Sequence, residues 1–356
     1  MAKRSVIPGA DWDDFAEPIV ASSQPPPIRG RGASVNPANR FEALALEPDP
    51  EDLADEERPS LTTKFYRDFT RTIIAHNDSP DVGFESSVNP YRGCEHGCIY
   101  CYARPTHEYL GFSAGLDFES RIMVKEDAPE LLAAELSKPS WKPQTIAMSG
   151  VTDPYQPVER RLRLTRRCLE VLAKFRNPVG IITKNALVTR DIDLLGELAA
   201  HGAAAVNISI TSLDPKLQRI LEPRTSTPRA RLDAIAQLRA AKIPVGVMVA
   251  PIIPGLTDHE APAILQACAA AGAQWAGYTV VRLPYAVAPL FERWLEEHFP
   301  ERKEKVLGRI RHLRGGERLN DPNFNSRMVG EGIFAEQIRG LFEAGCRRAG
   351  MGERGK

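Results

Sequence analysis

The sequence contains no apolar run that approaches the ~20 residues needed to cross a bilayer. Cysteine is scarce, with 6 residues in a chain of 356, so a disulfide scaffold is excluded. Neither sign of charge dominates, because 46 Lys and Arg balance 46 Asp and Glu. No glycine-rich loop of the P-loop or dinucleotide-binding type follows a predicted strand, so these two nucleotide sites have no support. The N-terminus turns acidic at Asp11 without entering an apolar leader. These absences favour a cytoplasmic protein with no membrane contact.

Residues 1–60 are predicted to form an acidic, proline-rich arm that is largely extended or disordered. Nine of the 29 prolines precede position 60, and residues 1–58 hold 12 acidic against 6 basic side chains. Such a composition cannot build a hydrophobic core. Residues 29–41 are less acidic than the rest of the arm. Two alternatives are open for this segment, which either packs against the main body or a partner, or is a solvated tail.

From about position 120 onward, short apolar runs alternate with amphipathic segments of helical length. Continuous apolar runs such as residues 245–250 are typical of parallel strands that are buried on both faces. The predicted strands span residues 121–125, 145–148, 179–183, 205–210, 245–250 and 278–281. The predicted helices span residues 128–137, 162–175, 191–201, 228–241, 259–271 and 289–298. This order predicts an α/β fold.

The spacing of these segments leaves a full or partial (β/α) barrel and a doubly wound sheet as alternatives. In both folds, chemistry is expected in the loops that follow the carboxyl ends of the strands. Polar side chains are concentrated in four such loops, at residues 149–159, 183–185, 211–214 and 251–258. Residues 301–356 are predicted to form a helical C-terminal extension. Three cysteines stand alone in helical segments and are predicted to be core thiols, namely Cys168, Cys268 and Cys346.

Two further polar motifs permit both functional and structural interpretations. Residues 160–167 contain five arginines, which could attract a phosphate-bearing substrate or form a solvated helix face. No interleaved aromatic platform for stacked bases is evident beside this run. Glu222 and Arg224 either flank the active site or have a structural role.

Three of the cysteines lie within eight positions, as Cys94, Cys98 and Cys101. Thiolates so close in sequence can converge on one centre only if the backbone curls around it, and Gly93 and Gly97 supply the conformational freedom for that curl. We therefore expect this loop to wrap a metal centre.

The identity of that centre depends on the number of ligands. Structural zinc normally takes four ligands, and no fourth cysteine lies nearby in sequence. Three thiolates would leave one iron of an iron–sulfur cubane open to an exogenous ligand, as chemistry at the cluster requires. Zinc with His96 or His107 as the fourth ligand stays open as an alternative.

The spacing C-x3-C-x2-C, with Tyr100 before the third cysteine, resembles the signature of the radical S-adenosylmethionine (SAM) superfamily. The strings at residues 98–104 and 149–159 are similar to the branch related to spore photoproduct lyase, and within it to a bacterial group of unassigned reaction. The resemblance covers about residues 85–300. It implies a partial (β/α)6 barrel whose mouth holds a [4Fe-4S] cluster and one SAM. It also implies reductive cleavage of SAM to a 5′-deoxyadenosyl radical that abstracts hydrogen from a substrate.

The resemblance further implies roles for single residues. Cys94, Cys98 and Cys101 would ligate the cluster, and Tyr100 would pack near the adenine. Tyr102 would either contact the cofactor or pack beside the cluster loop. No residue is assigned to the hydrogen transfer.

The remaining implied residues would contact SAM. Four in the loop after the second predicted strand would meet the methionine ammonium group, with Asp153 as its countercharge. Lys184 would face the SAM carboxylate, and Ser209 would reach the ribose. The complete implied set is Ser149, Gly150, Thr152, Asp153, Lys184 and Ser209.

Two functions of different class are therefore predicted. The first is a radical SAM enzyme that receives electrons from a donor such as flavodoxin or ferredoxin and acts on an unknown substrate, with nucleic acid as one candidate. The second is a non-catalytic zinc- or cluster-bearing nucleic-acid-binding protein. Spore photoproduct lyase uses a cysteine close after its second barrel strand as a hydrogen donor, and residues 149–153 contain none. Thymine-dimer repair is therefore not predicted for this chain. The long acidic N-terminal arm is a second departure from the lyase.

Overall fold

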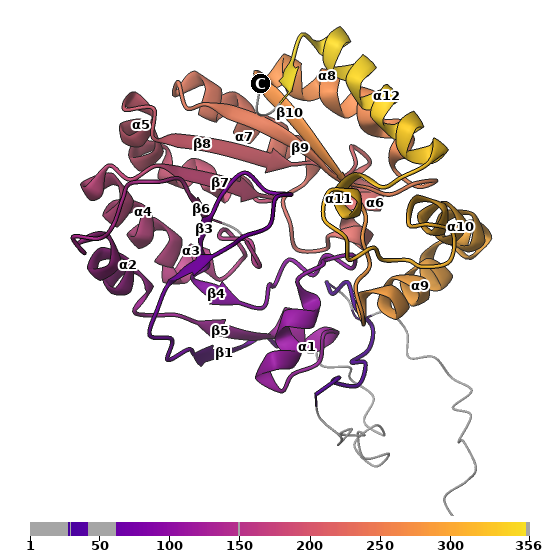
Figure 1. Cartoon of the computed structure of the whole chain (residues 1–356), viewed down its shortest axis with the longest axis horizontal. Helices are drawn as coiled ribbons and strands as arrows, with labels where there is room; N and C mark the ends of the chain where they lie inside the picture. Colours follow the sequence, from indigo (N-terminus) through magenta and orange to yellow (C-terminus); the bar gives the residue numbers. More distant parts are fainter. Residues whose placement is uncertain (1–27, 29, 42–61, 149, 354–356) are drawn as a thin grey trace, which may run out of the picture.

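The computed structural model describes residues 28, 30–41, 62–148 and 150–353. Most of the predicted N-terminal arm lies outside the described residues. The main feature of the fold is an eight-stranded sheet in the order β11-β10-β9-β8-β7-β6-β3-β2 (Figure 1). Its centre consists of parallel strands, namely β3 (Ser86–Val88), β6 (Ile146–Met148), β7 (Val179–Thr183), β8 (Ala204–Ser209), β9 (Val245–Ile252) and β10 (Trp275–Val280).

The two edges of this sheet are not paired with each other. Strand β2 (Ile74–His76) joins one edge antiparallel to β3, and the short β11 (Gly352–Glu353) joins the other edge parallel to β10. The sheet is therefore an open barrel with six central parallel strands. The predicted partial (β/α)6 architecture is confirmed.

Helices connect the parallel strands, as the sequence predicts. The connecting helices are α2 (Ala128–Leu136), α3 (Glu159–Leu162), α4 (Leu164–Phe175), α5 (Ile192–Ala200), α6 (Pro215–Leu221), α7 (Pro228–Ala240) and α8 (Ala261–Ala271). Helix α4 shows why these segments are helical, because buried apolar residues recur every three or four positions along the side that faces the core. They include Cys168, Leu169 and Leu172. Helix α7 begins at a proline, and the side chain of Thr227 caps it by accepting a hydrogen bond from Ala230 N.

One predicted strand does not join the main sheet. Strand β5 (Arg121–Val124) pairs in parallel with β1 (Lys64–Arg67) and antiparallel with β4 (Tyr91–Arg92), which makes a separate three-stranded sheet. The main sheet instead begins its parallel series at β3. Strands β1, β3 and β4 are short and lack an apolar run, so the sequence did not predict them.

The three solitary cysteines are buried in the main core. Cys168, Cys268 and Cys346 belong to one cluster of apolar side chains that the strands share with the surrounding helices. The prediction of core thiols is confirmed. Among the described residues, no helix is long and apolar enough to span a membrane.

The C-terminal part packs beside the end of the sheet. It contains α9 (Val287–His298), α10 (Lys303–Leu313), α11 (Ser326–Val329) and α12 (Ile333–Ala349). Helices α12 and α8 lie side by side (Figure 1). Gly345 permits this close approach, since a Cβ there would lie 2.6 Å from Leu265 Cδ1. The segment after position 300 is thus largely helical, and it is fixed to the barrel.

Candidate functional site

The three clustered cysteines lie on the loop that follows β4. The loop curls in short turns, because Gly97 N donates to the carbonyl oxygen of Cys94 at 3.5 Å and Cys101 N to that of Cys98 at 3.2 Å. Gly97 has a φ of +68°, and a Cβ at this position would lie 2.8 Å from Glu119 Oε2. Glycine is therefore required here both for its conformation and for its lack of a side chain.

Cysteine thiolates are the ligands of iron–sulfur clusters, and Cys94, Cys98 and Cys101 are free thiols on one loop. Burial raises the pKa of Cys98, and the Glu222 carboxylate raises it further. Burial is also the largest cause of the raised pKa of Cys101, and the charge of Cys94 is the next largest. Thiols in such surroundings become thiolates when a metal binds them. Among the described residues, no three His, Cys, Asp or Glu side chains converge on a single metal ion. A cubane does not need that convergence, because each thiolate binds a different iron.

His96 and His107 are the two histidines near the cysteines that could supply a fourth ligand to a zinc ion. Both ring nitrogens of His96 are engaged, since Nδ1 lies 3.4 Å from Asp153 Oδ2 and Nε2 lies 3.2 Å from Asn185 Nδ2. His107 Nε2 lies 2.9 Å from the carbonyl oxygen of Arg121, while its Nδ1 is buried with no hydrogen-bond partner among the described residues. Of these two histidines, only His107 has a ring nitrogen left to bind a zinc ion.

Arg104 stabilises the conformation of the cysteine loop by hydrogen bonds to its backbone. This arginine is fully buried, and its Nε and Nη2 donate to the carbonyl oxygen of Cys98 at 3.1 and 2.9 Å. Its charge is balanced by the buried Glu119, whose Oε1 lies 2.5 Å from Arg104 Nη2. Neither the role of Arg104 nor that of Glu119 is evident in the sequence, because both depend on contacts that form only in the folded chain.

The same carboxylate binds the segment at residues 30–41. Glu119 accepts hydrogen bonds from the backbone N–H groups of Gly32 and Ala33 at 3.0 and 2.9 Å. A Cβ on Gly32 would lie only 1.8 Å from the carbonyl oxygen of Gly97, so this segment touches the cysteine loop directly. Of the two alternatives for the segment, packing against the main body is the one observed.

The loop that follows β6 is the candidate SAM loop, and it lies against the cysteine loop. Ser149, its first predicted site residue, lies outside the described residues. The side-chain oxygen of Asn89 accepts from the backbone N–H groups of Gly150, Val151 and Thr152 at 2.9, 3.0 and 3.4 Å. Tyr102 of the cysteine loop donates its hydroxyl to the carbonyl oxygen of Gly150 at 2.7 Å. The two loops that the sequence singled out are therefore in contact.

Asp153 is a buried centre of hydrogen bonds. Its Oδ1 accepts from Thr183 Oγ1 at 2.7 Å and from Tyr155 N at 2.9 Å. Its Oδ2 accepts from Lys184 N at 2.8 Å and lies 3.4 Å from His96 Nδ1. Burial alone would raise its pKa, but His96 and these donors lower the pKa to about 2. The carboxylate thus links the cysteine loop, the candidate SAM loop and β7.

Tyr100 is hydrogen-bonded to a second buried carboxylate, Glu222, and the charge of Lys184 acts on the same carboxylate. The Tyr100 hydroxyl donates to Glu222 Oε1, and Thr211 Oγ1 donates to the same oxygen at 2.7 Å. Arg231 forms an ion pair with the other oxygen. Burial would raise the pKa of Glu222, but Arg231 and then Lys184 lower it to about 2. Lys184 Nζ lies 5.9 Å from the centre of the Tyr100 ring and donates to the carbonyl oxygen of Ala250 at 3.2 Å.

Ser209 lies on the face of β8 opposite the helix-packed core. Along this strand, Val206 and Ile208 belong to that core, and side chains alternate between faces. Asn207 and Ser209 therefore share the inner face, and Asn207 Oδ1 accepts from the indole N–H of Trp275 at 2.9 Å. The predicted residue Ser209 thus lies on the inside of the open barrel.

The Glu222 to Arg224 motif also flanks the cysteine loop. Arg224 Nη2 lies 3.1 Å from Glu95 Oε1, and its backbone N–H donates to the carbonyl oxygen of His96 at 3.2 Å. Of the two interpretations of this motif, the one that places it beside the candidate site is observed.

Two of the five arginines in the run at residues 160–167 form ion pairs with other parts of the fold. Arg166 pairs with Asp191 and Asp193, and Arg167 pairs with Glu130. This pairing favours the structural interpretation for these two positions.

Exposed aromatic side chains gather at the same end of the barrel, next to arginines. The Arg282 guanidinium lies 4.9 Å from the Tyr102 ring centre, and its buried Nε has no hydrogen-bond partner among the described residues. The Arg40 guanidinium lies 3.8 Å from the ring centre of Tyr285. Phe41 stacks on Tyr109 at a centroid distance of 4.9 Å. We call these residues the mouth surface, which consists of Arg40, Phe41, Tyr102, Tyr109, Arg282 and Tyr285.

The mouth surface was not evident in the sequence because its members come from distant segments. Tyr109 follows the cysteine loop, and Tyr285 lies in the loop after β10. Arg40 belongs to the docked N-terminal segment and is held by the buried Glu108, with Nη2 to Oε2 at 2.8 Å. Because folding alone brings the residues of the mouth surface together, they form no local pattern in the sequence.

Three comparisons with known proteins bear on this site. The model of the radical SAM superfamily matches residues 88–268. An uncharacterized protein of Mycobacterium tuberculosis is 41% identical over 232 residues, which are 65% of this chain and 67% of that protein. A radical SAM Nalpha-GlyT isomerase of Pseudomonas phage M6 is 26% identical over 218 residues, which are 60% of this chain and 43% of the isomerase.

Among solved structures, spore photoproduct lyase complexed with dinucleoside spore photoproduct superposes with a TM-score of 0.58. The match covers 83% of this chain and 82% of the lyase at 15% sequence identity. A C140S mutant of the same lyase superposes with a TM-score of 0.57 at 16% identity, over 84% of this chain and 85% of the mutant. At these identities the likeness concerns the fold.

Proposed function

The chain belongs to the radical SAM superfamily and is a radical SAM enzyme, and from this membership we propose that Cys94, Cys98 and Cys101 hold a [4Fe-4S] cluster beside one SAM molecule. Bound together, the two groups supply reductive cleavage of SAM and a 5′-deoxyadenosyl radical that abstracts hydrogen from the substrate. The observation that carries the proposal is the contact between the two loops, in which Tyr102 donates to the carbonyl oxygen of Gly150.

The residues around these loops would bind and orient SAM. In this proposal, Ser149, Gly150 and Thr152 hold the methionine ammonium group. Asp153 is a positioning residue, because both of its oxygens already accept hydrogen bonds. It keeps the backbone of Lys184 beside the loop that holds the ammonium group.

Three further side chains would surround the rest of the cofactor. Lys184 Nζ uses one of its three N–H groups on Ala250, which leaves donors for the SAM carboxylate. Tyr100 is fixed by Glu222, so its ring has a defined orientation for packing against the adenine. Ser209 would meet the ribose from the inner face of β8.

We propose nucleic acid as the substrate class. Exposed aromatic rings bind unpaired bases by stacking, at about 1–3 kcal/mol per base, and arginines add attraction for phosphates. Tyr109 and Tyr285 on the mouth surface are 72% and 64% exposed, which leaves their rings accessible to a base. Arg282 adds an incompletely satisfied guanidinium beside Tyr102. A spore photoproduct lyase with the same fold is complexed with a dinucleoside photoproduct.

The cofactor assignment is tested on protein purified without oxygen. We expect iron and acid-labile sulfide to copurify, and we expect 5′-deoxyadenosine to form from SAM when dithionite is added. Cys98→Ala should lose both the iron and this product. Cys168→Ala, which removes a buried thiol of the core, should keep both and serves as the matched control. Colourless protein that contains zinc would contradict the proposal.

The substrate class is tested separately by fluorescence anisotropy with a labelled single-stranded DNA 12-mer. Tyr285→Ala should weaken binding by about ten-fold, which corresponds to the loss of one stacked base. Phe175→Ala, at an exposed ring on α4, is the control and should not change the affinity. Equal affinities for the two variants and the wild type would exclude the mouth surface as a nucleic-acid site while leaving the SAM chemistry intact.

We propose flavodoxin or ferredoxin as the electron donor of the cluster. We also propose that the protein acts in the cytoplasm. Replacing dithionite by reduced flavodoxin or ferredoxin in the 5′-deoxyadenosine assay should support product formation. Failure of both proteins as donors, with dithionite still active, would exclude this pair of partners.

A further inference from the structure

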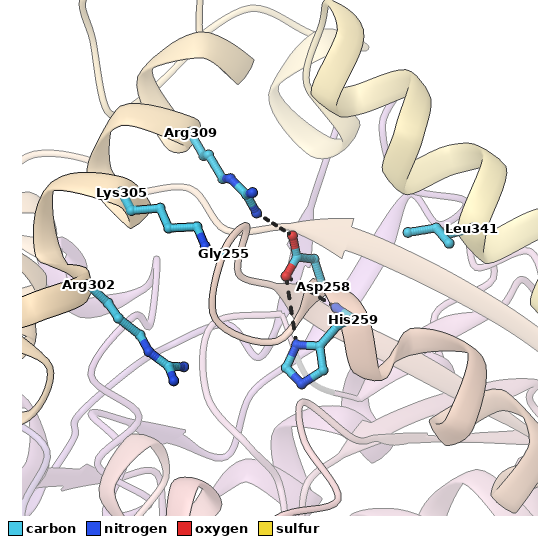
Figure 2. A pocket seen from close by; sticks show the side chains of 7 residues that line it. All are labelled: Gly255, Asp258, His259, Arg302, Lys305, Arg309 and Leu341. Carbon is cyan, nitrogen blue, oxygen red and sulfur yellow. Dashed lines mark hydrogen bonds and ion pairs between the residues drawn. The ribbon is translucent and has the colours of Figure 1, made fainter.

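A pocket of about 410 Å³ lies beyond the carboxyl end of β9. One wall is the loop that leaves β9, with Gly255, Asp258 and His259. The other wall is the 3-10 turn η6 (Pro300–Arg302) with α10, which contribute Arg302 and Lys305 among their side chains (Figure 2). None of these residues belongs to the cofactor site described above.

Cationic side chains follow one face of the α10 wall. Arg302, Lys305 and Arg309 are spaced at i, i+3 and i+7, a pattern that places side chains on the same side of a helix. Figure 2 shows Lys305 extending toward Gly255 and Arg309 toward Asp258. The positive groups therefore converge on the loop.

The negative charge in the pocket does not balance these groups. Asp258 is its single carboxylate, and it already pairs with Arg309 at 3.1 Å. Within the described part of the chain, the ion pair of Arg302 is with its chain neighbour Glu301 at 3.8 Å, and both side chains are more than half exposed, so this pair contributes little. Lys305 has no ion pair among the described residues. Lys305 and the weakly paired Arg302 therefore leave a surplus of positive charge in a concave surface, which concentrates their field.

The loop opposite these cations is held in one shape. Gly255 has a φ of +82°, which favours glycine, and a Cβ there would lie 3.3 Å from Arg309 Cδ. Thr257 Oγ1 accepts from Ile253 N at 2.9 Å, which closes the turn. A side chain at position 255 would crowd the Arg309 side chain. Glycine at this position therefore leaves room for Arg309 to reach Asp258.

We propose that this pocket binds the phosphate group of a nucleotide or another phosphate monoester. Arginine and lysine donors placed together match the charge and the several acceptor oxygens of a phosphate. The volume exceeds what a bare phosphate fills and lies within the range of small-molecule pockets. Leu341 of α12 supplies an apolar side chain at the rim for the rest of such a ligand. The inference stands apart from the proposed SAM chemistry.

The test is isothermal titration calorimetry on the cluster-containing protein in phosphate-free buffer. Cytidine 5′-monophosphate, cytidine and inorganic phosphate are titrated separately, and a pyrimidine is chosen to avoid the site proposed for adenine. We expect the monophosphate to bind at least ten-fold more tightly than cytidine, because the base alone can only stack on the mouth surface. The double variant Arg302→Gln/Lys305→Gln should weaken the monophosphate at least ten-fold. Lys174→Gln, on the exposed side of α4, is the matched control and should bind like the wild type.

The outcomes separate the two sources of phosphate. If inorganic phosphate binds as tightly as the monophosphate and the double variant loses both, the site stands and its ligand is free phosphate. Equal binding of cytidine and its monophosphate would overturn the proposal, as would full affinity in the double variant. Absence of any binding heat with millimolar monophosphate or phosphate would also overturn it. All of these results are independent of 5′-deoxyadenosine formation, which can be measured on the same samples.

Discussion

Glu222 holds a negative charge inside the protein, where a carboxylate is stable only if neighbouring groups replace its lost hydration. Arg231 balances the charge, and the hydroxyls of Tyr100 and Thr211 donate to the same side chain. Because Tyr100 lies between two of the clustered cysteines, this network couples the position of the cysteine loop to β8 and α7. A buried carboxylate of this kind is a structural support for the candidate site.

The network predicts a pH-dependent loss of stability. The folded pKa of Glu222 is about 2 and its ordinary value is 4.5, so the carboxylate stabilises the fold above pH 4.5 and this stabilisation is lost as the pH falls through about 2. Glu222→Gln should therefore destabilise the protein by about 3–5 kcal/mol at pH 7, because Arg231 is left unpaired. The difference from wild type should shrink between pH 4.5 and pH 2. Urea denaturation of the metal-free proteins at pH 7, 4 and 2.5 measures it, and a constant difference would contradict the role of Glu222.

Asn89 allows a prediction about SAM affinity that is independent of charge. Its side-chain oxygen gathers three consecutive N–H groups of the candidate SAM loop. Asn89→Ala removes this acceptor, and the SAM dissociation constant should rise by about ten-fold, the value of one to two lost hydrogen bonds. Asn89→Asp keeps an acceptor oxygen and should bind SAM more tightly than the alanine variant. Equal affinities of these two variants in equilibrium binding assays would show that the loop does not depend on Asn89.

At the scale of elements, periodicity predicted the strands and helices of the barrel well. Strand β7 has the predicted bounds, because Val179–Thr183 is a continuous apolar run with clear turn residues on both sides. The helix predicted at residues 162–175 corresponds to α4, which begins two positions later, at Leu164. Arg163 has a φ of +53°, which ends the short helix α3 and separates it from α4, and an arginine gives no sign of this conformation in the sequence. The pairing of β5 was missed because its partners are short and distant.

The same distinction holds for the candidate site. The cysteines and the loop after β6 were found because they form local motifs. Arg104, Glu119 and Asn89 were missed, because each acts through contacts with residues far away in sequence. Local spacing therefore reveals groups that would touch a cofactor, whereas the residues that position them emerge only from the folded chain.

The docked segment at residues 30–41 gives a prediction at this scale. Gly32→Ala places a Cβ where it would lie 1.8 Å from the carbonyl oxygen of Gly97, so the segment has to move away from the cysteine loop. We expect the variant to bind less than half of the wild-type iron and its cysteine loop to exchange amide hydrogens faster. Gly196→Ala is the control, since a Cβ in that helix meets nothing within 4 Å. Unchanged iron content and exchange in Gly32→Ala would mean that the segment does not support the loop.

For the whole molecule, side chains bridge the open edges of the main sheet. Asp81 lies in the loop between β2 and β3, at one edge. It accepts from Asn325 N at 2.5 Å and pairs with Arg327 of α11, beside β10 near the other edge. The Asp81 side chain is 1% exposed, so this ion pair is almost removed from water. The barrel is therefore completed by an ion pair where backbone pairing ends.

Breaking this bridge should destabilise the entire fold. Asp81→Ala leaves Arg327, whose side chain is 20% exposed, without its partner and should reduce the free energy of unfolding by about 3 kcal/mol, within the range for buried pairs. Asp233→Ala breaks the exposed pair with Arg229 and should change stability by less than about 1 kcal/mol. Thermal and urea denaturation of both variants compare the two. Similar effects of the two substitutions would show that the bridge is dispensable.

The Asp81 bridge also dictates when the enzyme can be completed during synthesis. Arg327 is 246 positions further along the chain, so the ribosome has already passed all six central strands of the sheet before this contact can form. The cysteine loop therefore leaves the ribosome long before the two open edges of the sheet can be joined. Folding of the barrel starts without this contact, and the link between its edges is among the last to form.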